Sequence, residues 1–175
     1  HQVSVELASA NGNSSGPIDL GPLYVSRGGR DFEPPQPETP LAVDLGPALA
    51  LVGFDGPRVG GQTLDLTLFW HAKEETDISY RYYIHIFDAE TGELAVQLDG
   101  VPRDWSYPTN SWDAGEYVSD PLSVPLGGVE PGTYVINVGF YHPDNGERLP
   151  ATSADGSTIT DNTIPLAEFD INTRD

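Results

Sequence analysis

Residues 63–71, Thr-Leu-Asp-Leu-Thr-Leu-Phe-Trp-His, decide the fold class. Leu64, Leu66, Leu68 and Trp70 fall at every second position, so in an extended chain they share one face. Thr63, Asp65 and Thr67 then share the other face. Strict alternation of this kind predicts a β-strand with one buried side rather than a helix.

Further strand signals lie on both sides of this stretch, and no segment carries a helical period. Residues 88–92 and 142–146 each end in glycine between two strand signals, which is typical of short hairpin connections. In the first of them, Gly92 can supply the left-handed residue of a type I turn with a bulge. The expected strands cover residues 48–54, 63–71, 80–87, 93–98, 116–125, 135–141, 148–151 and 164–171.

This pattern predicts an all-β, antiparallel, immunoglobulin-like sandwich of about seven to nine strands. Before it, residues 2–8 and 18–26 predict two shorter strands, joined by an Asn/Gly/Ser loop at residues 11–16. The stretch between them and the sandwich holds Pro34, Pro35, Pro37 and Pro40, and it favours an extended linker. We therefore divide the chain into an N-terminal strand segment (1–26), a Pro-rich linker (27–40) and a sandwich domain (41–175).

The composition excludes several classes of partner. Against 27 acidic residues stand only 8 basic ones, a net charge of −19. Nucleic acids require Lys and Arg to displace counterions, so a nucleic-acid partner is disfavoured, and so is an anionic membrane. The acidic excess suits a saline or calcium-rich medium, or solubility through mutual repulsion. The chain lacks Cys, which excludes thiolate metal sites, and it contains no apolar run long enough to span a membrane.

The absence of Met and the start at His1 predict removal of an initiator, either with a cleaved leader or by trimming. We expect an extracellular or cell-surface protein of bacterial origin.

A series of short motifs follows in order along the chain. They are residues 32–35 (FEPP), 40–46 (PLAVDLG), 49–55 (LALVGFD), 66–70 (LTLFW), 84–88 (IHIFD), 107–112 (YPTNSW), 115–116 (GE), 131–134 (PGTY), 139–141 (GFY) and 146–150 (GERLP). In this order they resemble the extracytoplasmic β-sandwich regions beside dolichyl-phosphate-mannose-type membrane glycosyltransferases of Chloroflexi-like bacteria. The resemblance implies a surface-exposed accessory module that handles glycans, and it supplies no catalytic residue.

The loop at residues 104–113 is the candidate carbohydrate-binding site. Sugars present apolar faces that stack on aromatic rings, while Asp and Asn accept hydroxyl hydrogens. The alternative is that Tyr107 and Trp112 plug one end of the sandwich. Since Pro108 and small polar residues make this a loop, we expect Trp105 to be more exposed than Trp112. The candidate ligands are Asp104, Trp105, Tyr107, Asn110 and Trp112. In the strand at residues 80–87, either Tyr82 or Tyr83 is expected in the core.

A second candidate is a calcium site at Asp144, Asn145 and Glu147, because hard cations prefer several oxygen ligands. Residues 155–161 offer a similar turn. Neither matches the EF-hand spacing, so both could instead be solvated turns. Apart from calcium, no cofactor is expected.

No catalytic motif is present in the sequence. It contains no Gly-X-Ser-X-Gly elbow, phosphate loop or dinucleotide fingerprint, and carboxylate pairs such as Glu74–Glu75 are uninformative among so many acids. We therefore expect a non-catalytic accessory or binding module whose partner is a polysaccharide or a cell-surface glycan.

Two alternative functions remain open. In the first, the protein is a structural subunit of an extracellular assembly, in which Val3, Val5 and Leu7 form a strand that pairs with another copy. The same strand could equally fold back onto its own sheet. In the second, His1 binds copper through its amine and imidazole, with His71, His85 or His142 as the third nitrogen.

Overall fold

The computed structural model describes residues 2–5, 18–22 and 29–172, and the chain forms two compact units, His1–Arg30 and Asp31–Asp175. In the first unit, β1 (Gln2–Val5) pairs antiparallel with β2 (Ile18–Pro22) as a two-stranded sheet. The expected loop at 11–16, the end of the second strand at 23–26, and Leu7 lie outside the described residues. Within the described part, the strand that holds Val3 and Val5 pairs with β2.

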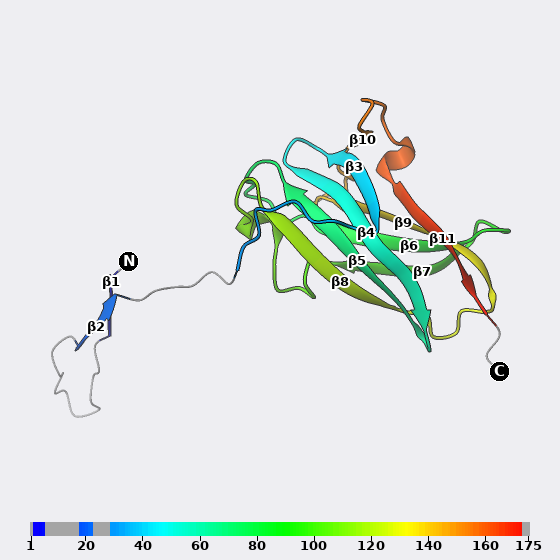
Figure 1. The fold of residues 1–175 in the computed structure, drawn as a ribbon, viewed down its shortest axis with the longest axis horizontal. Coiled ribbons are helices and arrows are strands. Elements are labelled where there is room, and N and C mark those ends of the chain that lie inside the picture. Colours follow the sequence, from blue (N-terminus) through cyan, green and yellow to red (C-terminus); the bar gives the residue numbers. More distant parts are fainter. Residues whose placement is uncertain (1, 6–17, 23–28, 173–175) are drawn as a thin grey trace. The chain divides into compact units, whose positions relative to one another are not determined.

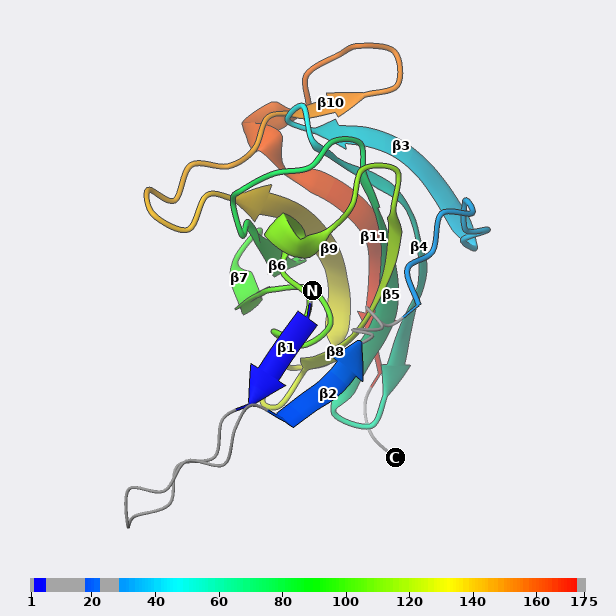
Figure 2. The same cartoon turned by 90° about the vertical axis from the view of Figure 1, so that its left-hand side faces the viewer.

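The second unit is an all-β antiparallel sandwich, as the sequence predicts. Its two sheets lie face to face (Figures 1 and 2). Besides strands, the described part of this unit holds only two three-residue helical turns, η1 (Thr109–Ser111) and η2 (Thr160–Asn162). The five-stranded sheet consists, in spatial order, of β10 (Ala151–Ser153), β3 (Thr39–Leu45), β4 (Leu49–Gly60), β5 (Thr63–Ala72) and β8 (Tyr117–Pro125). The four-stranded sheet consists of β11 (Ile164–Ile171), β9 (Gly132–Tyr141), β6 (Arg81–Asp88) and β7 (Leu94–Gly100).

The connectivity is that of an immunoglobulin-like sandwich. The chain crosses from β5 in one sheet to β6 in the other, returns from β7 to β8, and crosses again from β8 to β9. The order β11-β9-β6-β7 matches the G-F-C-C′ sheet of variable-type immunoglobulin domains. In this sheet every ladder is antiparallel, and the pairing of β6 with β9 brings residues from sequence-distant strands side by side on its outer face.

The core lies between the sheets and follows from period-two alternation. On β5 the buried residues are Leu64, Leu66, Leu68 and Trp70, as expected, together with Ala72. The facing strands β6 and β9 contribute residues at alternate positions, and the Trp70 and Phe140 rings meet across the interface at 4.6 Å between centroids. The inward residues of these strands are Tyr82, Ile84, Ile86, Tyr134, Ile136, Val138 and Phe140.

The two expected hairpin turns form, but only the first joins two strands of one sheet. Gly92 and Gly146 both have φ of 73°, and each donates its N–H to the carbonyl four residues earlier. After the second turn, pairing with β9 is limited to a bridge between Tyr141 and Arg148 and one further backbone hydrogen bond. The expected strand at 148–151 is therefore wrong. Pro150 has no N–H to continue the ladder, and Ala151 begins β10 in the other sheet.

The Pro-rich linker is shorter than expected, because its second half packs on the sandwich. Asp31 accepts the N–H of Tyr117 at 2.8 Å, so the second unit begins there. The Pro37 ring covers Gly53 of β4, where a side chain would collide with it. β3 then begins at Thr39, inside the predicted linker. Proline cannot donate to a ladder, but its ring can still cover bare backbone.

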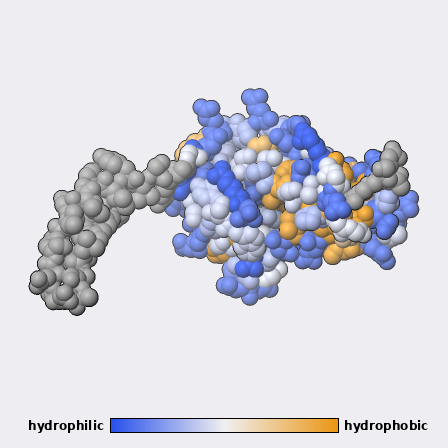
Figure 3. Space-filling model, turned by 90° about the horizontal axis from the view of Figure 1, so that it is seen from below, coloured by the Kyte–Doolittle hydropathy of each residue, from blue (hydrophilic) through white to orange (hydrophobic). Residues whose placement is uncertain are grey.

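Hydrophilic residues dominate much of the visible surface, with apolar residues gathered in one area of the sandwich (Figure 3). Among the residues whose exposure is known, the large hydrophobic side chains that stay exposed are Phe32, Val59, Leu94 and Trp105. In the described residues, no helix has the length and apolar character needed to cross a membrane.

Candidate functional site

The predicted carbohydrate loop divides into an exposed part and a packed part. Trp105 is 56% exposed and Trp112 only 3%, which confirms the expected difference. The Trp112 indole donates to the Tyr107 carbonyl at 3.1 Å, and the Tyr107 hydroxyl donates to the buried Glu116 carboxylate at 2.6 Å. Tyr107 and Trp112 therefore fit the alternative interpretation, in which their rings pack against the sandwich. Asp104 and Asn110, like Trp105, remain exposed.

Trp105 is presented by an unusual turn. Arg103, Asp104 and Trp105 have φ of 55°, 50° and 65°, the left-handed region that non-glycine residues avoid at a cost of about 1–2 kcal/mol each. Surrounding contacts hold the turn, because Trp105 donates its N–H to Val101 and Arg103 donates its N–H to the buried Asp120 carboxylate. Strained backbone that is over-determined in this way is concentrated at functional sites.

Arg81 joins Trp105 to the four-stranded sheet. Its guanidinium carbon lies 5.3 Å from the centroid of the Trp105 ring, within cation–π distance. Arg81 begins β6 and is the register partner of Tyr141 on β9. The exposed tryptophan is thus continuous with the outer face of this sheet.

Aromatic side chains run along that outer face in an unbroken row. Tyr141 and Tyr83 have ring centroids 6.5 Å apart, Tyr83 and His85 4.8 Å, and His85 and Phe87 5.9 Å. Tyr83, His85 and Phe87 occupy alternate positions of β6, so the pleat that sends Tyr82, Ile84 and Ile86 into the core turns them outward. We call Trp105, Tyr141, Tyr83, His85 and Phe87 the aromatic row.

Four members of the aromatic row, all but Trp105, line two adjoining hollows of about 380 and 480 Å³, which we call together the sheet trough. His85 and Arg148 line both hollows, so the two are continuous. The polar residues are of the kinds that bind hydroxyl groups. They are Gln97, Asp99, Asn137, Thr160, Asp161 and Thr163.

Arg148 is the cation of the sheet trough, and its position is fixed by three contacts. Its guanidinium carbon lies 4.8 Å from the centroid of the Tyr83 ring. Its Nη1 donates to the Asp161 carbonyl at 3.1 Å and to the Thr163 hydroxyl at 2.8 Å. Tyr83 is itself held, since its hydroxyl donates to the Asn162 carbonyl at 2.9 Å. Tyr83 is only 2% exposed, so it supports Arg148 rather than presenting a free ring.

The electrostatics favour neutral forms of two side chains in the trough. Desolvation lowers the pKa of His85, the Arg148 charge lowers it further, and Asp99 opposes both. His85 is therefore neutral at pH 7, with one nitrogen to donate and one to accept. Desolvation and the Asp99 charge raise the pKa of Tyr141, so its phenol keeps its proton.

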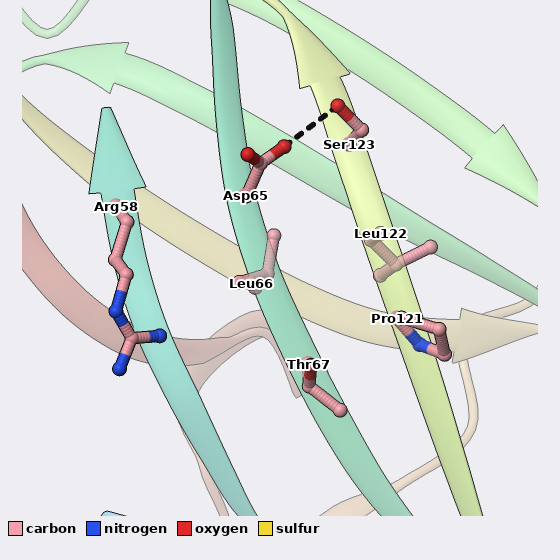
Figure 4. Close-up of a pocket in the computed structure, with 7 residues that line it drawn as sticks. All are labelled: Arg58, Asp65, Leu66, Thr67, Pro121, Leu122 and Ser123. Atoms are coloured by element: carbon pink, nitrogen blue, oxygen red, sulfur yellow. Dashed lines mark hydrogen bonds between the residues drawn. The ribbon is translucent and has the colours of Figure 1, made fainter. Parts of the chain in front are cut away.

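A third hollow, of about 300 Å³, lies on the five-stranded sheet and lacks aromatic residues. Figure 4 shows its lining residues, which come from β4, β5 and β8, with the Ser123 hydroxyl donating to Asp65 at 2.7 Å. Without a ring for a sugar to stack on, it offers less for carbohydrate binding than the sheet trough does.

The calcium and copper candidates do not converge on a common set of ligands. Asn145 and Glu147 hydrogen-bond to one another, and Asp144 donates its N–H to His142. Throughout the described ranges, no three His, Asp or Glu side chains gather in a metal-binding arrangement. His71 and His85 belong to opposite sheets, and His1 lies outside the described residues. The metal hypotheses stay predictions.

The sheet trough was missed at the sequence level, although β6 contains a signal for it. Residues 82–87 read Tyr-Tyr-Ile-His-Ile-Phe, so one face is Tyr82, Ile84 and Ile86, and the other carries three rings. Alternation of apolar with aromatic residues indicates two buried or covered faces. Arg148 could not have been found in this way, because only the tertiary fold brings it over Tyr83.

Comparisons with known proteins give a structural likeness but no family. No protein-family model matches the sequence, and no curated protein matches it. Among solved structures, the C-terminal domain of wzt is similar, with a TM-score of 0.47 and 13% sequence identity over 78% of this chain and 85% of that chain. The functional argument below therefore rests on the geometry of the sheet trough.

Proposed function

We propose that this protein is a non-catalytic, extracellular binding module that holds a glycan in the sheet trough. The observation that carries the proposal is the aromatic row, flanked by carboxylate, amide and hydroxyl groups in two adjoining hollows. This is the combination that a sugar requires, because its C–H faces stack on rings while its hydroxyls need fixed polar partners.

Each part of the trough has a distinct role in this proposal. The half-buried Tyr141 is a platform for a sugar ring at one end, and Trp105, which contacts Arg81 beside that end, is a second platform outside the hollows. Asp99, Gln97 and Asn137 accept or donate hydrogen bonds along the middle. From Arg81 to Phe87 the strand spans about 20 Å at 3.3 Å per residue, enough for several linked sugars.

The regular backbone of the trough favours binding over catalysis. Three of the six polar residues, Gln97, Asp99 and Asn137, belong to paired strands, which hold them at fixed spacing before a ligand arrives. Pre-organisation of this kind reduces the entropy cost of ordering side chains, a cost that opposes binding.

Binding to immobilised polysaccharides tests the proposal. The panel contains neutral glucan, xylan and mannan together with the acidic polysaccharides glucuronoxylan, gellan and polygalacturonate. We expect the wild type to be retained by at least one member, and Trp105→Ala to weaken that binding by about 1–3 kcal/mol. Phe32→Ala is the matched control, because Phe32 is an aromatic of similar exposure, 53%, outside the trough. Loss of retention in both variants, or retention by no member, would overturn the proposal.

A second candidate function is self-assembly through the first unit. In the described part this unit is a single pair of strands, and a two-stranded ribbon is marginally stable in water when alone. Addition of β1 or β2 to the sheet edge of another copy would supply the missing partner. Deletion of the unit tests this idea, as described below.

A further inference from the structure

We infer that the glycan of the sheet trough carries isolated carboxylate groups, and that the Arg148 guanidinium binds them. The inference rests on the proposed function and names the class of glycan. The ligand would be a polysaccharide that contains uronic acid, with acidic sugars spaced among neutral ones or present singly at the bound position.

The first argument is the orientation of the guanidinium. Both hydrogens of Nη1 are used, by the Asp161 carbonyl and the Thr163 hydroxyl. Neither Nε nor Nη2 donates to any of the residues that the structure describes, so the edge that they form keeps its two parallel N–H donors. Arg148 is exposed and lines both hollows, so a ligand in the trough can reach its guanidinium. A carboxylate matches such an edge with two parallel hydrogen bonds.

The second argument is the fixed position of the cation. Stacking on Tyr83 and two hydrogen bonds hold the Arg148 head group in place before any ligand binds. A free arginine would lose rotamer entropy when it binds an anion, whereas this one has already lost it. A charge that is pre-ordered beside polar groups is the arrangement expected of a recognition site.

The third argument is the absence of an internal counter-ion. Elsewhere Arg58 pairs with Glu38, and Lys73 pairs with Asp44 at 2.7 Å. Arg148 forms no ion pair within the part of the chain that is described, although the protein carries 27 acidic residues. An anionic ligand would complete this pairing.

The neighbouring carboxylates limit the charge density of the ligand. Asp99 lines one hollow and Asp161 the other, so each would repel a second acidic sugar placed beside it. A ligand with one carboxylate at Arg148 and hydroxyl groups at Asp99 would bind both side chains favourably. A densely sulfated chain would instead place further negative charges beside Asp99 and Asp161. At 0.15 M salt the Debye length is about 8 Å, so the net charge of −19 does not prevent a contact at this short range.

Pairs of polysaccharides that differ only in their carboxyl groups test the inference. Glucuronoxylan and gellan, in which uronic acids are spaced among neutral sugars, are each compared with their methyl esters by affinity electrophoresis. Polygalacturonate and dextran sulfate serve as the densely charged references, and unmodified dextran as the uncharged one. We expect the wild type to bind glucuronoxylan or gellan at least tenfold more tightly than its ester, and dextran sulfate no better than dextran.

Variants locate the effect. Arg148→Gln should lose at least tenfold in affinity for the acidic chain and little for the ester, while Arg148→Lys should retain part of the preference. Arg58→Gln makes the same change in net charge on the opposite sheet and should have no effect. Because the comparison of acid with ester uses the wild type, it decides the point even if Arg148→Gln fails to fold.

The outcomes separate the two proposals. Equal binding of acid and ester overturns the carboxylate inference and leaves glycan binding intact, and so does a preference that Arg148→Gln retains. Tighter binding of dextran sulfate or polygalacturonate than of both glucuronoxylan and gellan overturns the requirement for isolated carboxylates. Failure to bind any neutral or acidic polysaccharide overturns glycan binding itself, and the inference with it.

Discussion

The carboxylate of Asp120 accepts the backbone N–H of Arg103 at 2.6 Å, and this bond anchors the turn that presents Trp105. Its other oxygen accepts the indole N–H of Trp70 at 3.2 Å, in the centre of the core. Asp120 is fully buried on β8. One side chain therefore ties the strained turn to the most deeply packed part of the sandwich.

Asp120 should make stability depend on pH. Burial raises the pKa of Asp120, and its hydrogen bonds to Arg103 and Trp70 reduce that rise. An acid whose pKa is higher in the folded state gives stability that is complete below its unfolded pKa, about 3.9, and lost as pH rises through the folded value. We expect the free energy of unfolding of wild type, minus that of Asp120→Asn, to fall as pH rises above the unfolded pKa of about 3.9. Urea denaturation at a series of pH values measures this difference. A difference that stays constant with pH would contradict a raised pKa of Asp120 in the folded protein.

The two tryptophans of the loop should respond oppositely to truncation. Trp112→Ala removes a packed ring and its bond to Tyr107, so it should lower the free energy of unfolding by about 3–5 kcal/mol. Trp105→Ala removes an exposed ring and should change the free energy by about 0.5 kcal/mol or less. Trp105→Gly should be at least as stable as Trp105→Ala, since glycine adopts positive φ without strain. Thermal and chemical unfolding of the three variants are compared; a Trp105→Ala variant as unstable as Trp112→Ala would contradict the assignment.

His85 should report the charge of the trough in NMR titrations. The Arg148 cation lowers the pKa of His85, so Arg148→Gln should raise it, and Asp99→Asn should lower it further. A bound carboxylate should raise the His85 pKa, because a nearby anion favours the imidazolium. A bound neutral sugar should lower it by added desolvation. A His85 pKa unchanged in both variants would mean that these charges do not reach the imidazole.

The acidic excess should make stability depend on salt. If mutual repulsion limits the fold, the melting temperature should rise by several degrees as ionic strength increases, because screening shortens the range of the repulsion. Calcium at millimolar concentration should add to this effect only if a site exists, as at Asp144, Asn145 and Glu147. Sodium matched for ionic strength is the control, and equal melting temperatures in the two salts would remove the calcium hypothesis.

Deletion of residues 1–28 tests assembly through the first unit. If β1 or β2 pairs with another copy, the full chain should form higher-order species and the shortened chain should be monomeric. Light scattering after size exclusion measures both. A monomer in each case contradicts self-assembly by strand addition, while persistence of the larger species after deletion places the contact in the sandwich.

The sequence was sufficient for the sandwich because period-two alternation is a local property. In β5 each leucine is followed by a polar or partly covered residue, and only an extended chain can bury such a pattern. The limit of such reasoning is visible at residues 148–151, where only Ala151 belongs to a strand and pairs with β3 in the other sheet. Local pattern does not specify which sheet a short strand joins.

The candidate site was predicted only in part, for a related reason. Trp105 could be assigned to an exposed loop from Pro108 and the small polar residues around it. The same kind of reasoning could not predict that Trp105 lies next to the outer face of β6. That connection depends on Arg81, on the pairing of β6 with β9, and on an arginine brought in by the turn after β9. Each of these is a relation between segments far apart in the chain.

Gly139 lies beneath the outer end of the Tyr83 ring, where a side chain would collide with the phenol. The Tyr83 ring thus contacts both Gly139 and the Arg148 guanidinium on the outside of β9. A methyl group added at Gly139 would displace the Tyr83 ring, and with it the guanidinium that lies over the ring. The strength with which the module holds an acidic sugar could therefore be tuned, in evolution or by design, through a position that the sugar never touches.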